Sequence, residues 1–192
     1  MIQRKKSEGL REEHQLLDAE GVRTSLERIA QQILEHHPNP KQLLLIGIRT
    51  GGVHLAERLG ALLATQAKCE IPLGVMDITL YRDDVFIGLP RPEVGVTSLP
   101  CSLEERSVIL VDDVLFTGRT IRSALVELMD YGRPESVRLA VLIDRGHREL
   151  PIQPDYVGLS VKTTREQSVL VFLRQLGQAD RVALFSKASA GR

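Results

Sequence analysis

The chain has 192 residues, 43% hydrophobic and 26% charged, a composition that predicts one globular domain over residues 1–192 with a sizeable core. Its 25 lysines and arginines balance its 25 aspartates and glutamates, which excludes a global basic field for nucleic acid and an acidic tail. The two distant cysteines lack metal-ligand spacing, and no apolar run reaches the ~20 residues of a membrane span. Since the N-terminus also lacks an apolar signal segment, we expect a cytoplasmic protein with reduced cysteines.

The first periodic segment predicts an amphipathic helix. Apolar residues recur at helical spacing over residues 26–34, and Pro38 follows the end of the pattern. Thr24 and Glu27 are spaced as a capping box, which predicts that the helix begins near Thr24. Residues 1–20 are expected to form a flexible N-terminal extension.

Apolar runs typical of buried strands then alternate with helical segments. Strands are predicted at residues 43–48, 73–80, 108–111 and 137–143, and helices at residues 53–63 and 121–129. Continuous apolar strands separated by helices predict an α/β fold, with a mostly parallel, twisted sheet flanked by helices on both faces. Two short apolar pieces near the C-terminus are expected to be antiparallel or peripheral, at residues 169–173 and 181–185.

The stretch VILVDDVLFTGRT, residues 108–120, places two adjacent carboxylates at the carboxyl end of a predicted strand. Ligands of open α/β sheets bind beyond this end of the strands, so Asp112 and Asp113 are expected at a ligand site. Residues 117–120 lead straight into a helix, where hydroxyls, backbone N–H groups and the helix dipole all favour a phosphate. One loop thus offers acceptors for a diol and donors for a phosphate, which suits a ribose 5-phosphate.

These segments also allow other interpretations. The acids are also compatible with a solvated pair that ends a strand. A response-regulator receiver places its acid pair after its first strand, without a phosphate loop behind it. Residues 47–52, GIRTGG, have the glycine spacing of a Walker site, but Val53 stands where the lysine is required, and no GxGxxG occurs.

The stretch VILVDDVLFTGRT resembles the phosphoribosyl pyrophosphate signature of the type I phosphoribosyltransferases. The segments DITLYRDD (77–84), GRPESVRLAVLIDRGHRELPI (132–152) and TTREQ (163–167) resemble the pyrimidine operon attenuation regulatory proteins that are also uracil phosphoribosyltransferases, the PyrR family. Together they cover nearly the whole chain beyond Gly21. The resemblance implies the type I phosphoribosyltransferase fold with a small hood and a flexible flap over residues 81–100, and a homodimer or higher homo-oligomer. An ordinary surface hairpin is the alternative for the flap.

The resemblance implies synthesis of UMP and pyrophosphate from uracil and phosphoribosyl pyrophosphate. Uracil N1 would attack C1 of the sugar through an oxocarbenium-like transition state, a reaction that depends on positioning and charge neutralisation. Mg²⁺ would be held by pyrophosphate and ribose oxygens, and no metal cluster of protein ligands is expected. Asp112 and Asp113 would be the catalytic residues at the ribose hydroxyls, and Arg82 would act on the pyrophosphate.

The resemblance also implies the substrate-binding residues. The pyrophosphate loop matches residues 49–52, which could alternatively be a simple tight turn. Many relatives have an arginine where this chain has Gly51, so a charge-assisted contact is expected to be missing, although glycine lets backbone N–H groups approach closely. Arg145 would lie near the nucleobase, unless it is salt-bridged to Asp144 or Glu149. The full implied set is Arg49, Thr50, Gly51, Gly52, Val114, Leu115, Phe116, Thr117, Gly118, Arg119, Thr120, Arg145 and Val161.

A second function is implied by the resemblance alone. The relatives bind the leader RNA of the pyrimidine operon when UMP or UTP is present, and Arg23, Thr50, His147 and Arg148 match positions that could form an RNA-binding face. The alternative is that these residues are catalytic or solvated, in a salvage phosphoribosyltransferase without RNA regulation. A phosphoribosyltransferase for another base is a further alternative, which the segment DRGHRELP disfavours.

Overall fold

The structure, a computed structural model, describes residues 9–78 and 96–187. Its centre is a five-stranded parallel sheet in the order β3-β2-β4-β5-β6. The strands are β2 (Leu43–Ile48), β3 (Leu73–Met76), β4 (Ser107–Leu115), β5 (Ser136–Asp144) and β6 (Tyr156–Ser160). The predicted parallel sheet is thereby confirmed, and the carboxyl ends of all its strands meet at one edge.

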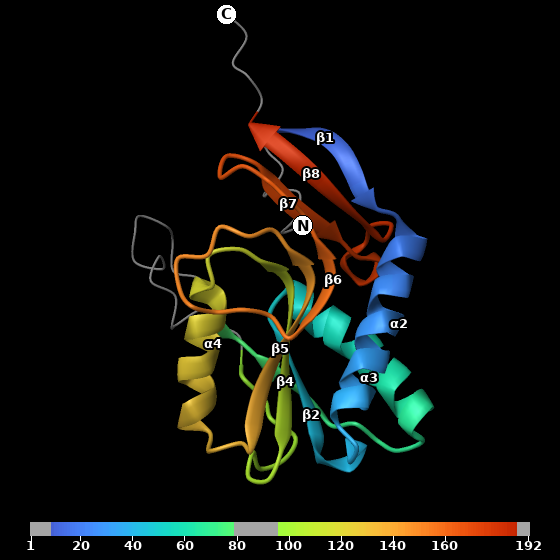
Figure 1. Cartoon of the computed structure of the whole chain (residues 1–192), viewed down its shortest axis with the longest axis vertical. Helices are drawn as coiled ribbons and strands as arrows, with labels where there is room; N and C mark the ends of the chain where they lie inside the picture. The colour runs from blue at the N-terminus through green and yellow to red at the C-terminus, as the bar shows by residue number, and fades with distance from the viewer. Residues whose placement is uncertain (1–8, 79–95, 188–192) are drawn as a thin grey trace, which may run out of the picture.

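Helices cover both faces of this sheet (Figure 1). Helices α2 (Ala19–His36) and α3 (Gly51–Ala67) pack on one face, and α4 (Arg119–Asp130) packs on the other. Strand β2 is continuously apolar because both of its faces are buried. Leu43 and Leu45 lie in the core under α2 and α3, whereas Leu44 and Ile46 lie in the core under α4. Successive side chains point to opposite faces of a strand, so burial of both faces requires apolar residues at every position.

A smaller antiparallel sheet forms the hood, drawn above the central sheet in Figure 1. Its strands lie in the order β1-β8-β7, with bounds β1 (Leu10–Leu17), β7 (Ser168–Phe172) and β8 (Arg181–Lys187). Val169 and Val182 on one face of the hood belong to the same core as α2 and α3. The two short C-terminal pieces are therefore antiparallel, as predicted, and they pack continuously with the central domain.

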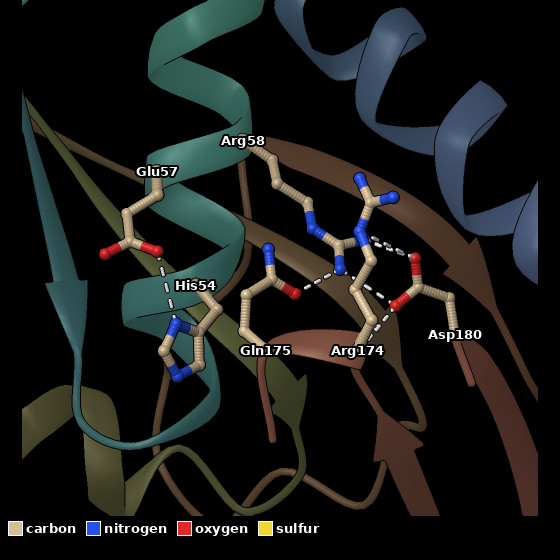
Figure 2. A network of polar contacts seen from close by, with 6 residues as sticks. All are labelled: His54, Glu57, Arg58, Arg174, Gln175 and Asp180. Carbon is tan, nitrogen blue, oxygen red and sulfur yellow. Dashed lines mark hydrogen bonds and ion pairs between the residues drawn. The ribbon is translucent and has the colours of Figure 1, made fainter. Parts of the chain in front are cut away.

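A polar network joins the hood to α3 (Figure 2). Both terminal nitrogens of Arg58 donate to the carboxylate of Asp180, each at 2.8 Å, and Nη2 also donates to Gln175. The side chains of Arg58 and Asp180 are only 14% and 11% exposed. This pair fixes the turn before β8 against the second helical turn of α3, close to the segment that the sequence assigns to pyrophosphate.

The N-terminal prediction was wrong over residues 10–20. Residues 10–17 form β1, which pairs with β8, and α2 begins at Ala19. Asp18 is the helix N-cap, and its carboxylate accepts a hydrogen bond from Gly21 N. The expected capping box is therefore not used: the hydroxyl of Thr24 donates within the helix to Glu20 O.

Other boundaries also differ from the prediction. Strand β4 continues to Leu115, so the acid pair lies inside the strand, while β3 ends at Met76. Strand β6 was not predicted. The predicted flap falls largely outside the described residues, but the part that is described includes Ser98, which forms an antiparallel bridge with Val75. Within the two described stretches, no helix is both long and apolar enough to cross a membrane.

Candidate active site

The loops at the carboxyl edge of the central sheet are tied to one another by backbone hydrogen bonds. Arg145 N donates to Leu115 O at 3.1 Å, and Val161 N donates to Asp144 O at 2.8 Å. Glu149 N reaches Thr117 O at 3.0 Å. The segments that follow β4, β5 and β6 therefore form one surface, which is where open α/β sheets bind ligands.

The two predicted catalytic acids lie on β4 close to this edge. Asp112 is 7% exposed, and one of its carboxylate oxygens accepts a hydrogen bond from Asp113 N at 2.9 Å. Asp113 Oδ1 accepts one from Val114 N at 2.8 Å. These local bonds hold both carboxylates in defined positions, which is the arrangement expected of groups that recognise a ligand.

The predicted pyrophosphate loop, residues 49–52, lies directly against the acids. A Cβ atom added to Gly51 would lie 2.3 Å from Asp113 Oδ2, and one added to Gly52 would lie 2.2 Å from Val111 O. Both distances are far below van der Waals contact. Glycine therefore permits the close approach of this loop to β4, and no residue with a Cβ could replace Gly51 in the present arrangement.

Two helices begin at this site without a side-chain cap. Thr50, at the N-cap of α3, and Gly118, at the N-cap of α4, make no capping hydrogen bond, whereas α2 is capped by Asp18. Gly118 has a φ of 92°, a conformation that favours glycine. An uncapped N-terminus presents backbone N–H groups and the positive end of the helix dipole, and it is well suited to bind phosphate.

Arg49 lies at the entrance of the pyrophosphate loop, just before the cis peptide bond to Thr50. Its side chain is 46% exposed, and its Nε lies 3.6 Å from Asp77 Oδ2, a carboxylate that is almost completely buried. Arg49 N donates to Met76 O at 2.9 Å. Asp77 thus orients a cation at the edge of the sheet, a role that was not predicted for this residue from the sequence.

Arg145 is buried at the base of the edge, with 7% of its surface exposed. Its guanidinium carbon lies 4.0 Å from the centre of the Phe116 ring, and Nη2 donates to Thr164 O at 2.8 Å. Burial lowers the pKa of Arg145 from its ordinary value. The alternative salt bridges of Arg145 were wrong, because Asp144 pairs with Arg148 and Glu149 pairs with Arg119 and Arg165.

The four residues predicted to bind RNA occupy different environments. Arg148 is 12% exposed, and its guanidinium donates to Phe116 O and Ile152 O at 2.9 Å besides its ion pair with Asp144. His147, the adjacent residue, contacts Thr163 O through Nε2 at 2.7 Å. The exposed residues are Arg23, which pairs with Glu20 and Glu27 on α2, and Thr50. Arg148 therefore supports its loop through internal contacts.

The remaining predicted residues lie around the acids or outside the described residues. Val161 follows β6 and is partly buried against the core under α2 and α3. Arg82 is outside the described residues. In the stretches 9–78 and 96–187, no three His, Cys, Asp or Glu side chains are grouped so that they could hold a metal ion.

Comparison with known proteins identifies the chain. The phosphoribosyl transferase domain matches residues 13–172. The bifunctional protein PyrR of Syntrophobacter fumaroxidans is 48% identical over 175 residues, 91% of this chain and 94% of that protein. The PyrR protein of Geobacter sp. (strain M21) is 53% identical over 156 residues, 81% of this chain and 88% of its own length.

Solved structures show the same fold at low sequence identity. Hypoxanthine phosphoribosyltransferase of Trypanosoma cruzi matches with a TM-score of 0.69 and 19% identity, over 92% of this chain and 98% of the other. A hypoxanthine-guanine phosphoribosyltransferase of Bacillus anthracis matches with a TM-score of 0.68 and 15% identity, over the same shares of the two chains. These matches confirm the predicted fold, and the relatives confirm the predicted family. The chain belongs to the phosphoribosyltransferase family and, within it, to the bifunctional PyrR proteins.

Proposed function

We propose that this protein transfers the phosphoribosyl group of phosphoribosyl pyrophosphate to uracil, with release of pyrophosphate and formation of UMP. The observation that carries this proposal is the contact between the pyrophosphate loop and the acids, where the backbone of Gly51 meets Asp113 Oδ2. The substrate has a diol between two phosphate-bearing ends. A carboxylate pair between two uncapped helix N-termini is complementary to such a molecule.

The two phosphate-bearing ends are assigned to different helices. The 5-phosphate binds at the start of α4, where residues 117–120 supply hydroxyls and backbone N–H groups and residues 114–116 line the approach. The pyrophosphate binds at the start of α3, where Arg49 adds a positive charge and the backbone of residues 50–52 adds N–H groups. Arg82 adds a second cation to the pyrophosphate, an assignment that rests on the family resemblance.

Asp112 and Asp113 bind the ribose hydroxyls. They face C1 of the sugar, where the bond to pyrophosphate breaks and the bond to uracil N1 forms. Their carboxylate oxygens are the hard ligands that suit Mg²⁺ held mainly by substrate oxygens, and Asp113 Oδ2 lies against the pyrophosphate loop. When bound, Mg²⁺ supplies neutralisation of the charge on pyrophosphate. The acids orient the sugar and stabilise positive charge that develops on it in the transition state.

The base binds beyond the acids, between the loops that follow β5 and β6. Arg145 and Val161 lie there, and the ring of Phe116 stacks on the Arg145 guanidinium. A fixed guanidinium on a short loop offers directional donors to the carbonyl groups of a pyrimidine. We assign uracil to this end of the site.

A panel of bases tests the proposed reaction. Pyrophosphate release from phosphoribosyl pyrophosphate is measured with uracil, hypoxanthine, guanine, adenine and orotate, each with Mg²⁺ and with a chelator. We expect turnover with uracil alone, and only with Mg²⁺. Equal rates with a purine would reject the assignment of the base.

The second proposed function is RNA-dependent regulation of pyrimidine genes. It is supported by the description of the relatives as bifunctional and by the residues Arg23, Thr50, His147 and Arg148 that match the RNA-binding pattern. UMP or UTP is the proposed effector, and the proposed assembly is a homodimer or a higher homo-oligomer, to be measured by sedimentation. Single-domain organisation and cytoplasmic location stay predictions.

The RNA proposal is tested by titration of a labelled pyrimidine-operon leader transcript at several salt concentrations. Arg23→Ala is the informative variant because Arg23 is exposed, whereas loss of Arg148 would also disturb its loop. One lost phosphate contact should reduce the salt slope of log K by about 1 without changing uracil turnover. The matched control is Arg133→Ala, an exposed arginine between α4 and β5. The regulatory proposal fails if the parent protein shows neither sequence preference nor a response to UMP.

A further inference from the structure

Glu127 is a buried acid outside the residues assigned above. It lies on α4, is 3% exposed, and accepts a hydrogen bond from the hydroxyl of Thr97 at Oε1. Its other oxygen, Oε2, is buried and has no hydrogen-bond partner among the described residues. A buried carboxyl with an unsatisfied oxygen is costly for the fold, so its position requires an explanation beyond packing.

The contact with Thr97 connects Glu127 to the strand that leads to the active site. Thr97 Oγ1 accepts a hydrogen bond from Asp77 N at 3.0 Å while it donates to Glu127. Beside it, Val75 and Ser98 exchange two backbone hydrogen bonds of 2.9 and 2.8 Å. The hydroxyl of Thr97 therefore joins α4 to the backbone of Asp77, and both of its hydrogen-bonding roles are used.

Asp77 in turn contacts Arg49, the first residue of the predicted pyrophosphate loop. Its carboxylate is 5% exposed and lies 3.6 Å from Arg49 Nε, while the backbone N–H of Arg49 is bound to the carbonyl of Met76. The side chain of Arg49 is 46% exposed. Three successive contacts therefore connect Glu127 to Arg49, by way of Thr97 and Asp77.

We propose that Glu127 is a positioning residue for the pyrophosphate subsite, acting through the Thr97 hydroxyl on Asp77 and thereby on Arg49. The inference rests on the proposed phosphoribosyl transfer, since it concerns how Arg49 is held for pyrophosphate. Glu127 does not contact the substrate in this arrangement. It fixes the position of a residue that does.

The electrostatics of Glu127 suit this role. Burial raises the pKa of Glu127, the carboxylates of Asp77 and Asp130 raise it further, and the hydrogen bond from Thr97 partly opposes the shift. A raised pKa favours the neutral carboxyl. Oε1 of Glu127 can accept the hydrogen bond from Thr97 in either protonation state.

Steady-state kinetics on paired variants of the full chain test the proposal. Glu127→Met and Thr97→Val each remove the contact, and each should raise KM for phosphoribosyl pyrophosphate about tenfold, the effect of one lost hydrogen bond of ordinary strength. Glu127→Gln and Thr97→Ser keep an acceptor and a hydroxyl, and should restore KM. The double variant Glu127→Met with Thr97→Val should be no worse than either single variant, because the two residues form one connection. KM for uracil should stay at the parent value.

A purely structural role is separated by a matched variant on the same helix. Leu128→Val removes one buried methylene from α4 and should lower the melting temperature without changing KM for phosphoribosyl pyrophosphate. The inference is overturned if the parent protein forms UMP but Glu127→Met and Thr97→Val keep the parent KM, or if Glu127→Gln is as defective as Glu127→Met. Failure of the parent to form UMP from uracil would instead reject the proposed function itself.

Discussion

At the scale of single residues, Gly51 accounts for the way the pyrophosphate loop meets the acids. From the sequence, Gly51 is expected to lack a charge-assisted contact and to let backbone N–H groups approach closely. The structure adds a steric reason, because a Cβ atom at this position would lie 2.3 Å from Oδ2 and 2.7 Å from Cγ of Asp113. The Asp113 carboxylate therefore fills the space that a side chain at position 51 would need.

Substitution of Gly51 by alanine is expected to displace either the loop or Asp113. We predict that Gly51→Ala raises KM for phosphoribosyl pyrophosphate at least ~10-fold, the effect of a misplaced binding group. The matched control is Gly60→Ala on the same helix, where the nearest atom to an added Cβ is Leu45 Cδ1 at 3.4 Å. Gly60→Ala should leave KM unchanged and stabilise the helix by up to ~1 kcal/mol. Similar KM values for the two variants would contradict this explanation of Gly51.

A second prediction concerns the protonation of Glu127. A carboxyl whose pKa is raised in the folded state contributes stability fully below its ordinary pKa of 4.5, and loses that contribution as the pH rises through the folded pKa. Burial is the main cause, and Asp77 and Asp130 act in the same direction. Glu127→Gln mimics the neutral form, so its stability relative to the parent should increase as the pH rises above 4.5. Denaturant unfolding between pH 4 and pH 8 measures this, and a difference that is constant with pH would be inconsistent with a raised pKa.

The sequence placed the acid pair on β4, and the two predicted phosphate loops before α3 and α4, because each motif is local. It could not predict the ring partner of Arg145, since Phe116 comes from a distant segment. Arg145 was expected near the nucleobase, with a salt bridge to Asp144 or Glu149 as the alternative, and in the structure its guanidinium packs on Phe116. Contacts of this kind are decided by tertiary packing, and no spacing in the sequence encodes them.

At the scale of secondary-structure elements, the attachment of the hood depends on the pair of Arg58 on α3 and Asp180 before β8 (Figure 2). Burial raises the pKa of Asp180, but hydrogen bonds from the Arg58 side chain and from Arg174 N outweigh it, so that the pKa is lowered overall. The carboxylate form is thus favoured by folding. Its contribution to stability is present above the ordinary pKa of 3.8 and is lost as the pH falls through the folded pKa.

Breaking this pair should therefore destabilise the protein strongly. We predict that Arg58→Met lowers the free energy of unfolding at pH 7 by about 2–4 kcal/mol, because an uncompensated carboxylate stays in a largely buried position. Arg174→Ala is the control: Arg174 is 74% exposed and lies 4.0 Å from Asp180, so the loss of its side chain should cost less than ~1 kcal/mol. Urea unfolding checks both values. Equal losses for the two variants would show that the buried pair has no special role.

The elements themselves were predictable to different degrees. The central strands were found because both of their faces are buried, and β2 was predicted with its observed bounds. Strand β1, LREEHQLL, was missed because most of its residues are exposed, and only its pairing with β8 makes it a strand. The start of α2 was predicted near Thr24, too late in the chain, because Asp18 and not Thr24 caps the helix.

At the scale of the whole molecule, the fold brings segments from four loops to one edge of a single sheet. Enzymes described as acting on purine bases share this fold at 15–19% identity. The shared architecture therefore does not by itself select the base, and the proposed base site lies in the loops after β5 and β6.

The central claim is that the site at the carboxyl edge makes UMP with Asp112 and Asp113 as its catalytic acids. The direct measurement is the formation of labelled UMP from labelled uracil and phosphoribosyl pyrophosphate with Mg²⁺, for the parent protein and for Asp112→Asn with Asp113→Asn side by side. We predict that the parent forms UMP and that the double variant is at least ~100-fold slower in turnover while it keeps the parent circular dichroism spectrum, since the lost interactions act mainly in the transition state. UMP formation by the double variant at the parent rate would contradict the assigned site, and no UMP from the parent would contradict the proposed reaction.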